Sequence, residues 1–351
     1  MKKHVLVILT GVIIGLISLT LVALGNPGNM GFCIACFLRD TAGALGLQNA
    51  PVVQYVRPEI IGLVLGACVM AFVGKEFAPR GGSSPVTRFI LGFCVMVGAL
   101  MFLGCPLRMM IRIGGGDLNA IIGLVGFVAG IGVGILALNK GFSLKRTYQL
   151  SKSEGLAYPV FSVVLLVVLV AFPSLLIFSK EGPGSMKAPL VAALAAGLIV
   201  GALAQRSRFC TVAGIRDTFM FKDLHMLWGF VAVIVTIVIG NLIMGSFTLG
   251  FAAQPIAHID GLWNFLGMLL VGFASVLLGG CPLRQLILAG EGSGDAVITV
   301  IGLTVGAAFC HNWGLASSGE GPTPNGKIAT IICLVVVVVI AITNLRRTKK
   351  A

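Results

Sequence analysis

Two short stretches of this 351-residue chain combine a cysteine, a proline and an arginine within apolar sequence. Residues 104–108 read GCPLR, and the same five letters return at 280–284. Proline fits the first position of a helix, where its missing N–H costs nothing. We therefore expect Cys105 and Cys281 to be the N-cap residues of two short helices.

The chemistry of these positions favours negative charge. A cysteine at a helix N-terminus lies at the positive end of the helix dipole, which favours the thiolate form. The free backbone N–H groups there can also receive an anion. Gly114 to Gly116 end the first helix and Gly290 to Gly292 the second, which limits each helix to about eight residues, or roughly 12 Å. We predict re-entrant half-helices, which occur at membrane depth only inside protein or along a cavity.

A second motif is repeated at almost the same distance. Phe32-Cys33-x5-Arg39-Asp40-Thr41 recurs as Phe209-Cys210-x5-Arg216-Asp217-Thr218, displaced by 177 residues, and the GCPLR motif is displaced by 176. Helical spacing would align one stripe in each copy. These stripes are Cys33, Cys36, Phe37 and Asp40 in the first copy, and Cys210, Ala213, Gly214 and Asp217 in the second.

Four arginines belong to the repeated motifs, namely Arg39, Arg108, Arg216 and Arg284. An arginine at the centre of a bilayer costs about 2.5–3.5 kcal/mol, so such residues usually face the protein interior and serve function. The alternative is structural pairing, as in Arg39–Asp40 or Arg216–Asp217. Arg112 reads as a loop charge near the interface. The nearby aspartates are either proton-linked groups or ion-pair partners and helix caps: Asp40, Asp217, Asp117 and Asp295.

Half-helix N-termini and arginines together indicate an anion, and repeated thiols favour one with a soft atom such as sulfur or selenium. The predicted substrate-binding residues are Cys33, Cys105, Cys210, Cys281, Cys36, Arg39, Arg108, Arg216 and Arg284. The cysteines in plain apolar segments are expected to pack as small hydrophobic residues. No fourfold set of metal ligands occurs, so we expect neither a metal nor another cofactor.

The elements that carry these motifs must lie in a membrane. Hydrophobic residues make up 57% of the chain and charged residues 11%, with a mean hydropathy of +1.04. Soluble domains carry about 25% charged residues, so the composition predicts an all-α integral membrane protein in contact with lipid. The net charge of +13 comes from loops and tails, and no basic-aromatic patch suggests nucleic acid as a partner.

Ten apolar segments are long enough to cross the bilayer. They lie near 5–24, 59–74, 88–103, 118–138, 159–179, 189–205, 226–247, 261–279, 296–310 and 327–345. We divide them into a first repeat, 1–180, and a second, 181–351, which together form one transmembrane domain. Five spans in each repeat is an odd number, so the halves must be inverted relative to each other, as in many secondary transporters.

Loop charges orient the spans. Lysine and arginine are frequent at the N-terminus, around 75–88, in 140–152 and at 346–350, whereas the loops 248–260 and 311–326 are poor in them. The positive-inside rule then places both termini in the cytoplasm of a multi-pass inner-membrane protein. On this orientation Cys33 and Cys105 face outside.

The two motifs resemble those of the YeeE/YedE sulfur-transport family of bacterial and archaeal inner-membrane proteins, which includes thiosulfate importers. The resemblance spans both halves and is closest to the YedE branch, described as selenium transporters, on GFCIACFLRDTAGALGL at 31–47 and RFCTVAGIRDTFMF at 208–221. It implies an hourglass-shaped helical protein in which Cys33, Cys105, Cys281 and Cys210 pass the substrate through a waist. Cys36 is an additional thiol.

We therefore interpret the chain as a permease, not an enzyme, for a thiosulfate-like anion or a selenium species. One alternative is a membrane thiol oxidoreductase that uses Cys33 and Cys36. Another is a membrane partner that hands sulfur or selenium to a cytoplasmic sulfurtransferase-like carrier.

Overall fold

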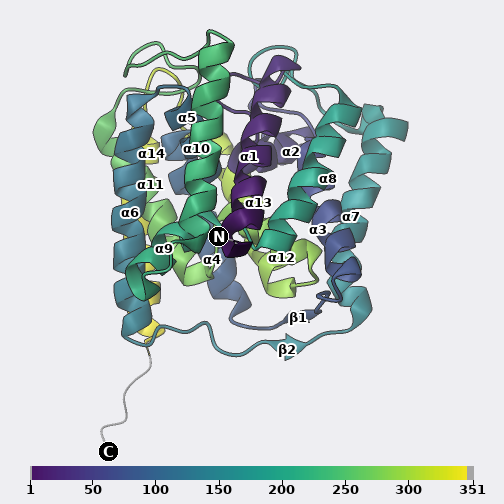
Figure 1. Ribbon diagram of the computed structural model, residues 1–351, viewed down its shortest axis with the longest axis vertical. Coiled ribbons are helices and arrows are strands. Elements are labelled where there is room, and N and C mark those ends of the chain that lie inside the picture. The colour runs from purple at the N-terminus through teal and green to yellow at the C-terminus, as the bar shows by residue number, and fades with distance from the viewer. Residues whose placement is uncertain (1, 346–351) are drawn as a thin grey trace, which may run out of the picture.

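The computed structural model describes residues 2–345, and its helices account for nearly all regular structure (Figure 1). The ten longer helices are α1 (Lys2–Ala23), α3 (Pro58–Val73), α4 (Pro85–Phe102), α6 (Leu118–Asn139), α7 (Lys152–Ala171), α8 (Leu190–Ser207), α10 (His225–Ile243), α11 (Gly261–Leu278), α13 (Gly294–Asn312) and α14 (Pro324–Thr343). The short elements are α2 (Ile34–Ala44), α5 (Pro106–Gly114), α9 (Thr211–Phe221), α12 (Pro282–Gly290), the 3-10 turn η1 (Pro173–Leu175) and the strands β1 (Arg80–Gly81) and β2 (Tyr148–Gln149).

The prediction of an all-α membrane protein is confirmed. Within residues 2–345, nine helical stretches are long and apolar enough to cross a membrane. The one predicted span outside these nine is the second, 59–74, which corresponds to α3; this helix is apolar but only 16 residues long. The basic tail at 346–350 lies outside the described residues.

The predicted bounds of the fifth span, 159–179, are wrong by about two turns. Helix α7 begins at Lys152, because the Ser151 side chain caps it and Glu154 completes a capping box. It ends at Ala171, just before Pro173 opens the short turn η1. The polar first turn therefore belongs to the helix, although its residues carry no apolar signal.

The two short GCPLR helices have the predicted form. Helices α5 and α12 each contain nine residues, begin with proline and follow an extended cysteine at the N-cap. Glycine dominates the segments after them, at 114–116 and 290–292. Each is therefore too short to span a bilayer alone.

The helices pair in a reciprocal manner between the two halves of the chain. Helix α3 packs on α8 as α10 packs on α1, and α6 packs on α11 as α13 packs on α4. The short helices follow the same rule, because α5 contacts α10 as α12 contacts α3. Strands β1 and β2 pair antiparallel at the lower end of the molecule (Figure 1).

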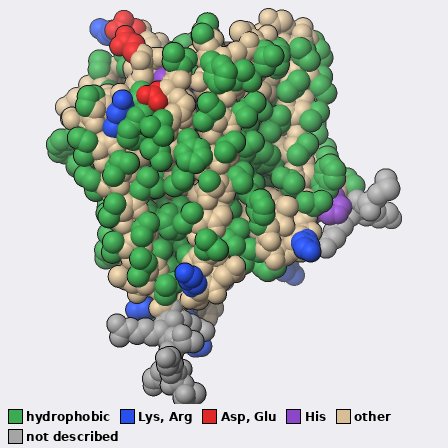
Figure 2. All heavy atoms as spheres, turned by 90° about the vertical axis from the view of Figure 1, so that its left-hand side faces the viewer, with side chains coloured by type: hydrophobic (Ala, Val, Ile, Leu, Met, Phe, Trp, Pro, Cys, Tyr) green, Lys and Arg blue, Asp and Glu red, His purple; other side chains and the backbone are tan. Residues whose placement is uncertain are grey.

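The motif-bearing helices lie at the centre of this arrangement. In the most apolar 18 residues of the stretches that end in α5 and α12, 89% and 83% of the residues are buried, against 28% in the corresponding parts of α7, α10 and α14. The outer helices expose branched apolar side chains such as Val164 and Val339. Figure 2 shows a face that is hydrophobic over its middle, with most of its lysine and arginine side chains toward the lower end and with acidic and a few basic side chains at the upper end. The protein therefore has an apolar belt of the kind that faces lipid, and it buries its repeated motifs.

Candidate functional site

Three thiols meet where the N-termini of α2 and α5 approach each other. Cys33 caps α2, and its sulfur accepts a hydrogen bond from the Cys36 backbone N–H at 3.4 Å. The Cys33 Sγ lies 2.8 Å from the Cys36 Sγ and 3.9 Å from the Cys105 Sγ. All three residues are at most 1% exposed. We call these three residues the first thiol cluster.

Local backbone geometry directs the chain into this cluster. Gly31 turns the chain with φ of 44°, in the left-handed region that favours glycine. The Ser18 and Ile111 side chains lie against it, so a larger residue would also be crowded. The turn leads directly into buried Phe32 and Cys33.

Arg108 supplies positive charge to the first thiol cluster. Its side chain is fully buried and donates to the backbone carbonyls of Asn29 and Ile256, both at 3.0 Å. Its Nη1 also donates to the Cys36 Sγ at 3.2 Å. Among residues 2–345, no carboxylate forms an ion pair with Arg108. A buried guanidinium without a carboxylate partner, beside three thiols, can stabilise a thiolate or a bound anion.

A matching thiol pair forms in the second half of the chain. Cys210 caps α9, Cys281 caps α12, and their sulfur atoms lie 3.9 Å apart. This equals the Cys33–Cys105 distance. Ala213 replaces the third thiol here. In Figure 1, α2 and α5 lie in the upper half of the molecule, and α9 and α12 in the lower half.

Arg284 of the second half differs from Arg108 in its partner. Its Nη1 donates to the Glu291 carboxylate at 3.1 Å. Burial raises the pKa of the Glu291 carboxyl, and the nearby Arg284 and Arg208 oppose that shift. The Arg284 charge is therefore neutralised in this structure, and the Arg108 charge is not.

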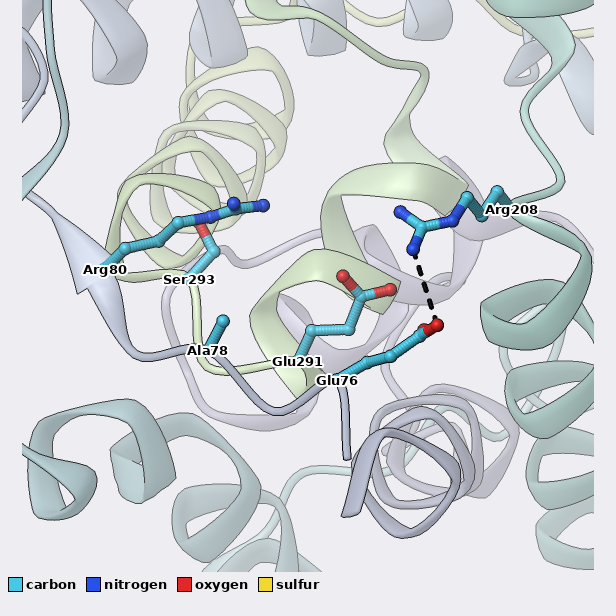
Figure 3. Close-up of a pocket in the computed structure, with 6 residues that line it drawn as sticks. All are labelled: Glu76, Ala78, Arg80, Arg208, Glu291 and Ser293. Carbon is cyan, nitrogen blue, oxygen red and sulfur yellow. Dashed lines mark ion pairs between the residues drawn. The ribbon is translucent and has the colours of Figure 1, made fainter. Parts of the chain in front are cut away.

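Glu291 also lines a cavity of about 220 Å³ at the lower end of the molecule. Figure 3 shows its carboxylate between the guanidinium groups of Arg80 and Arg208. Arg208 pairs with Glu76 at 3.5 Å across the same cavity. The Arg284–Glu291 pair therefore joins the second-half motif to a charged vestibule, which we define by Glu76, Ala78, Arg80, Arg208, Glu291 and Ser293.

The other two motif arginines pair with their neighbouring aspartates. Arg39 donates to Asp40 at 2.7 Å and is buried, whereas Arg216 donates to Asp217 at 2.8 Å and is partly exposed. Arg57, a residue that the motifs did not indicate, also binds Asp40. The structure thus brings Arg108 onto a thiol, while Arg39 and Arg216 bind carboxylates.

The remaining candidate aspartates hold buried structure together. Asp117 caps α6 and pairs with Arg112 at 2.7 Å. Asp295 accepts a hydrogen bond from the Ser83 N–H and lies 3.5 Å from Arg88. All four predicted aspartates therefore form ion pairs.

The interpretation of Arg112 as an interfacial loop charge is wrong. Its side chain is fully buried, bonds the Phe102 carbonyl at 2.7 Å and lies over that phenylalanine's ring. Arg57 is equally buried and lies just before Pro58. A charge at the edge of an apolar segment normally marks the membrane interface. The sequence signal was therefore ambiguous, and packing by distant segments decides burial.

The four other cysteines lie outside these two sites. Cys68, Cys94, Cys310 and Cys333 are buried in α3, α4, α13 and α14. In the described part of the chain, no group of three or more His, Cys, Asp or Glu side chains could hold a metal ion.

Residues 206–349 match the family model described as sulphur transport. The matched range includes both thiols of the second-half pair, Cys210 and Cys281, together with Arg284 and Glu291. No curated protein sequence matches the chain.

Proposed function

We propose that this chain, whose residues 206–349 belong to the sulphur transport family, carries a soft sulfur- or selenium-containing anion across an inner membrane. The observation that carries the proposal is the occurrence of two thiol pairs, each 3.9 Å between sulfur atoms, at the N-termini of buried half-helices. The match to the sulphur transport family supports a sulfur-related transporter. The polarisable sulfur atoms of the thiol pairs support an anion with a soft atom.

The first thiol cluster and Arg108 suit the receiving step. Arg108 offers positive charge, and the α2 and α5 N-termini offer the positive ends of their dipoles. The thiols of Cys33, Cys36 and Cys105 offer weak S–H donors and polarisable contacts to a terminal sulfur or selenium atom. Thiosulfate combines a soft sulfur with oxyanion charge and so meets both kinds of group.

The second-half residues suit the passing step. Cys281 and Cys210 form a thiol pair like that of the first half. Arg284 supplies a guanidinium group as Arg108 does, but Glu291 neutralises its charge. Two further ion pairs lie in the helices that follow Cys33 and Cys210, namely Arg39–Asp40 in α2 and Arg216–Asp217 in α9. Neither arginine touches a thiol in this conformation. The substrate moves by exchange of contacts, so no covalent bond to cysteine is required.

The two halves, 1–180 and 181–351, act as inverted repeats in this proposal, with both termini in the cytoplasm. The reciprocal helix pairs support this arrangement, because each pair joins one helix of each half. The opposite heights of α2 with α5 and of α9 with α12 support it as well (Figure 1). Cys33 and Cys105 then serve the outer side, and Cys210 and Cys281 the inner side.

The test is uptake of labelled thiosulfate and, separately, labelled selenite, in cells that lack their own importers for sulfur oxyanions. The wild type is compared with Cys105→Ser, Cys281→Ser and the control Cys68→Ser, whose thiol lies in α3. Loss of uptake in the first two variants alone supports the cysteine-lined path. Equal uptake by all variants contradicts it, and the substrate transported separates sulfur from selenium.

A second candidate function rests on the 2.8 Å separation of the Cys33 and Cys36 sulfur atoms. A vicinal dithiol this close can cycle through a disulfide, as a thiol oxidoreductase requires. Alkylation trapping of Cys36 in respiring and non-respiring cells tests this function. Delivery to a cytoplasmic sulfurtransferase-like carrier instead predicts co-purification with such a protein without uptake.

A further inference from the structure

Glu59 is a buried carboxylate in the first turn of α3 that lacks an ion-pair partner. It is 1% exposed, and its Oε1 accepts one hydrogen bond from the Asn26 side chain at 2.9 Å. Its Oε2 has no hydrogen-bond partner. A buried ionised carboxylate in this condition is costly, and protonation removes that cost.

The other buried carboxylates of residues 2–345 all have a basic partner. Asp40, Asp117, Asp295 and Glu291 each lie within 3.5 Å of an arginine nitrogen. Glu59 alone among the buried carboxylates in this part of the chain forms no such pair. Its negative charge is therefore not neutralised by an arginine in direct contact, unlike that of the other four buried carboxylates.

The charges around Glu59 are balanced only while it is ionised. Arg57 and Asp40 face it from the preceding segment and from α2, and Arg39 shares Asp40. Two guanidinium groups and two carboxylates then sum to zero, and protonation of Glu59 leaves one positive charge.

The remaining groups around Glu59 have the same charge whether or not Glu59 is protonated, and the Lys187 ammonium among them is exposed to solvent. The Tyr55 phenol is the other titratable neighbour, with the Lys187 ammonium over its ring at 4.6 Å. Helix α8 presents Gly197 to the Glu59 backbone. The uncompensated charge after protonation therefore belongs to the Arg57–Asp40–Arg39 group.

Asn26 connects Glu59 to the first thiol cluster. Its side-chain NH₂ donates both to Glu59 and to the Gly31 carbonyl, two residues before Cys33. Its oxygen accepts from the Ala188 N–H and from Arg57. A proton on Glu59 therefore changes the bonds that hold the loop leading to Cys33.

We propose that Glu59 is a proton-binding site and that a proton and the anion bind the protein together from the outer side. This inference rests on the proposed function. An inside-negative potential opposes the inward movement of an anion, and each accompanying proton cancels one negative charge. Binding is reciprocal, so the positive charge left by Glu59 protonation favours the anion and the anion favours protonation.

The experiment uses purified full-length protein in liposomes with the membrane potential clamped, and labelled thiosulfate as the probe. For each co-transported proton, a gradient of about one pH unit, acid outside, raises the equilibrium accumulation about tenfold. We expect this accumulation in the wild type and in the control Glu320→Gln, which changes an exposed loop carboxylate. We expect Glu59→Gln to exchange thiosulfate without gradient-driven accumulation.

Accumulation by Glu59→Gln equal to that of the wild type would overturn the inference. A wild type that carries neither thiosulfate nor selenite would instead overturn the proposed function. Infrared difference spectra between acid and alkaline solution then decide the proton site separately. A carbonyl band of a protonated carboxylic acid that is missing in Glu59→Gln supports the site, and identical spectra refute it.

Discussion

The Arg284 guanidinium donates to the Glu291 carboxylate at 3.1 Å, whereas Arg108, its counterpart 176 residues earlier, binds carbonyls and a thiol. Gly115 occupies the position that corresponds to Glu291. The two halves thus share their thiols and arginines but not the charge of the site. Under the proposed transport function, a fixed difference of this kind would leave the equilibrium distribution of substrate unchanged and alter the apparent affinity on each side.

Glu291→Gln should therefore strengthen anion binding from the inner side. The variant removes the negative charge that competes with the substrate for Arg284. A gain of about tenfold in inner affinity corresponds to about 1.4 kcal/mol, near the lower end for a hydrogen bond to a charged group. The measurement is the KM for efflux from preloaded liposomes, and slower net uptake should accompany it.

Glu76→Gln is the matched control, because Glu76 lines the same vestibule but pairs with Arg206 and Arg208. It should leave the efflux KM unchanged. Because burial raises the pKa of Glu291, inner acidification should protonate it at a higher pH than an exposed glutamate and move the wild type toward the variant. An unchanged efflux KM in Glu291→Gln would show that this carboxylate does not compete.

Arg108→Gln should weaken uptake from the outer side. The variant removes the buried positive charge beside the first thiol cluster, and hydrogen bonds to charged groups contribute about 1.5–3 kcal/mol. We expect a fall in kcat/KM for uptake of about 10- to 100-fold. The exposed Arg206→Gln is the control, and equal kinetics in both variants would remove Arg108 from the binding site.

The dithiol of the first thiol cluster should respond to a trivalent arsenical, which bridges two neighbouring thiols. Cys33 and Cys36 have sulfur atoms 2.8 Å apart, so phenylarsine oxide should block uptake, and a dithiol such as dimercaptopropanol should restore it. Cys36→Ala should lower the sensitivity of uptake to the reagent. Retained sensitivity in this variant would show that Cys36 is not needed and would indicate Cys33 and Cys105 as the bridged pair.

A cysteine introduced at position 213 should give the second half the same sensitivity to the arsenical. Ala213 lies three residues after Cys210, as Cys36 lies three residues after Cys33. In a Cys36→Ala background, Ala213→Cys should therefore restore sensitivity to the arsenical. The check is uptake with the reagent added before and after permeabilisation, since only an inner dithiol requires access from inside.

The repeated motifs predicted the helical caps because these depend on local sequence. Pro106 and Pro282 begin their helices for steric reasons, and the glycines after them end them. Four of the nine predicted site residues, the N-cap cysteines Cys33, Cys105, Cys210 and Cys281, therefore have definite backbone roles before any long-range contact is considered. The meeting of the thiols, by contrast, requires the whole bundle.

The charges near α3 were not predictable in the same way. Arg57 and Glu59 flank Pro58 at the edge of an apolar segment, where charged residues normally meet water. They are buried because Asn26 and the segment 183–188 fold over them. Burial of this kind depends on contacts between segments that are 31 to 129 residues apart, and no periodicity in the sequence reports it.

Close contact between α6 and α11 should depend on one glycine of α6 and not on its neighbour. A Cβ at Gly130 would collide with the backbone at Leu269 and Phe273, whereas a Cβ at Gly132 would meet nothing within 4 Å. Gly130→Val should destabilise the protein by about 1–3 kcal/mol through overpacking, and Gly132→Val should have little effect. Thermal unfolding in detergent, followed by the loss of monodisperse protein, measures the difference. Equal melting temperatures for the two variants would contradict this prediction, because a rigid contact between helix backbones cannot admit the side chain of valine. They would mean that α6 and α11 move apart easily.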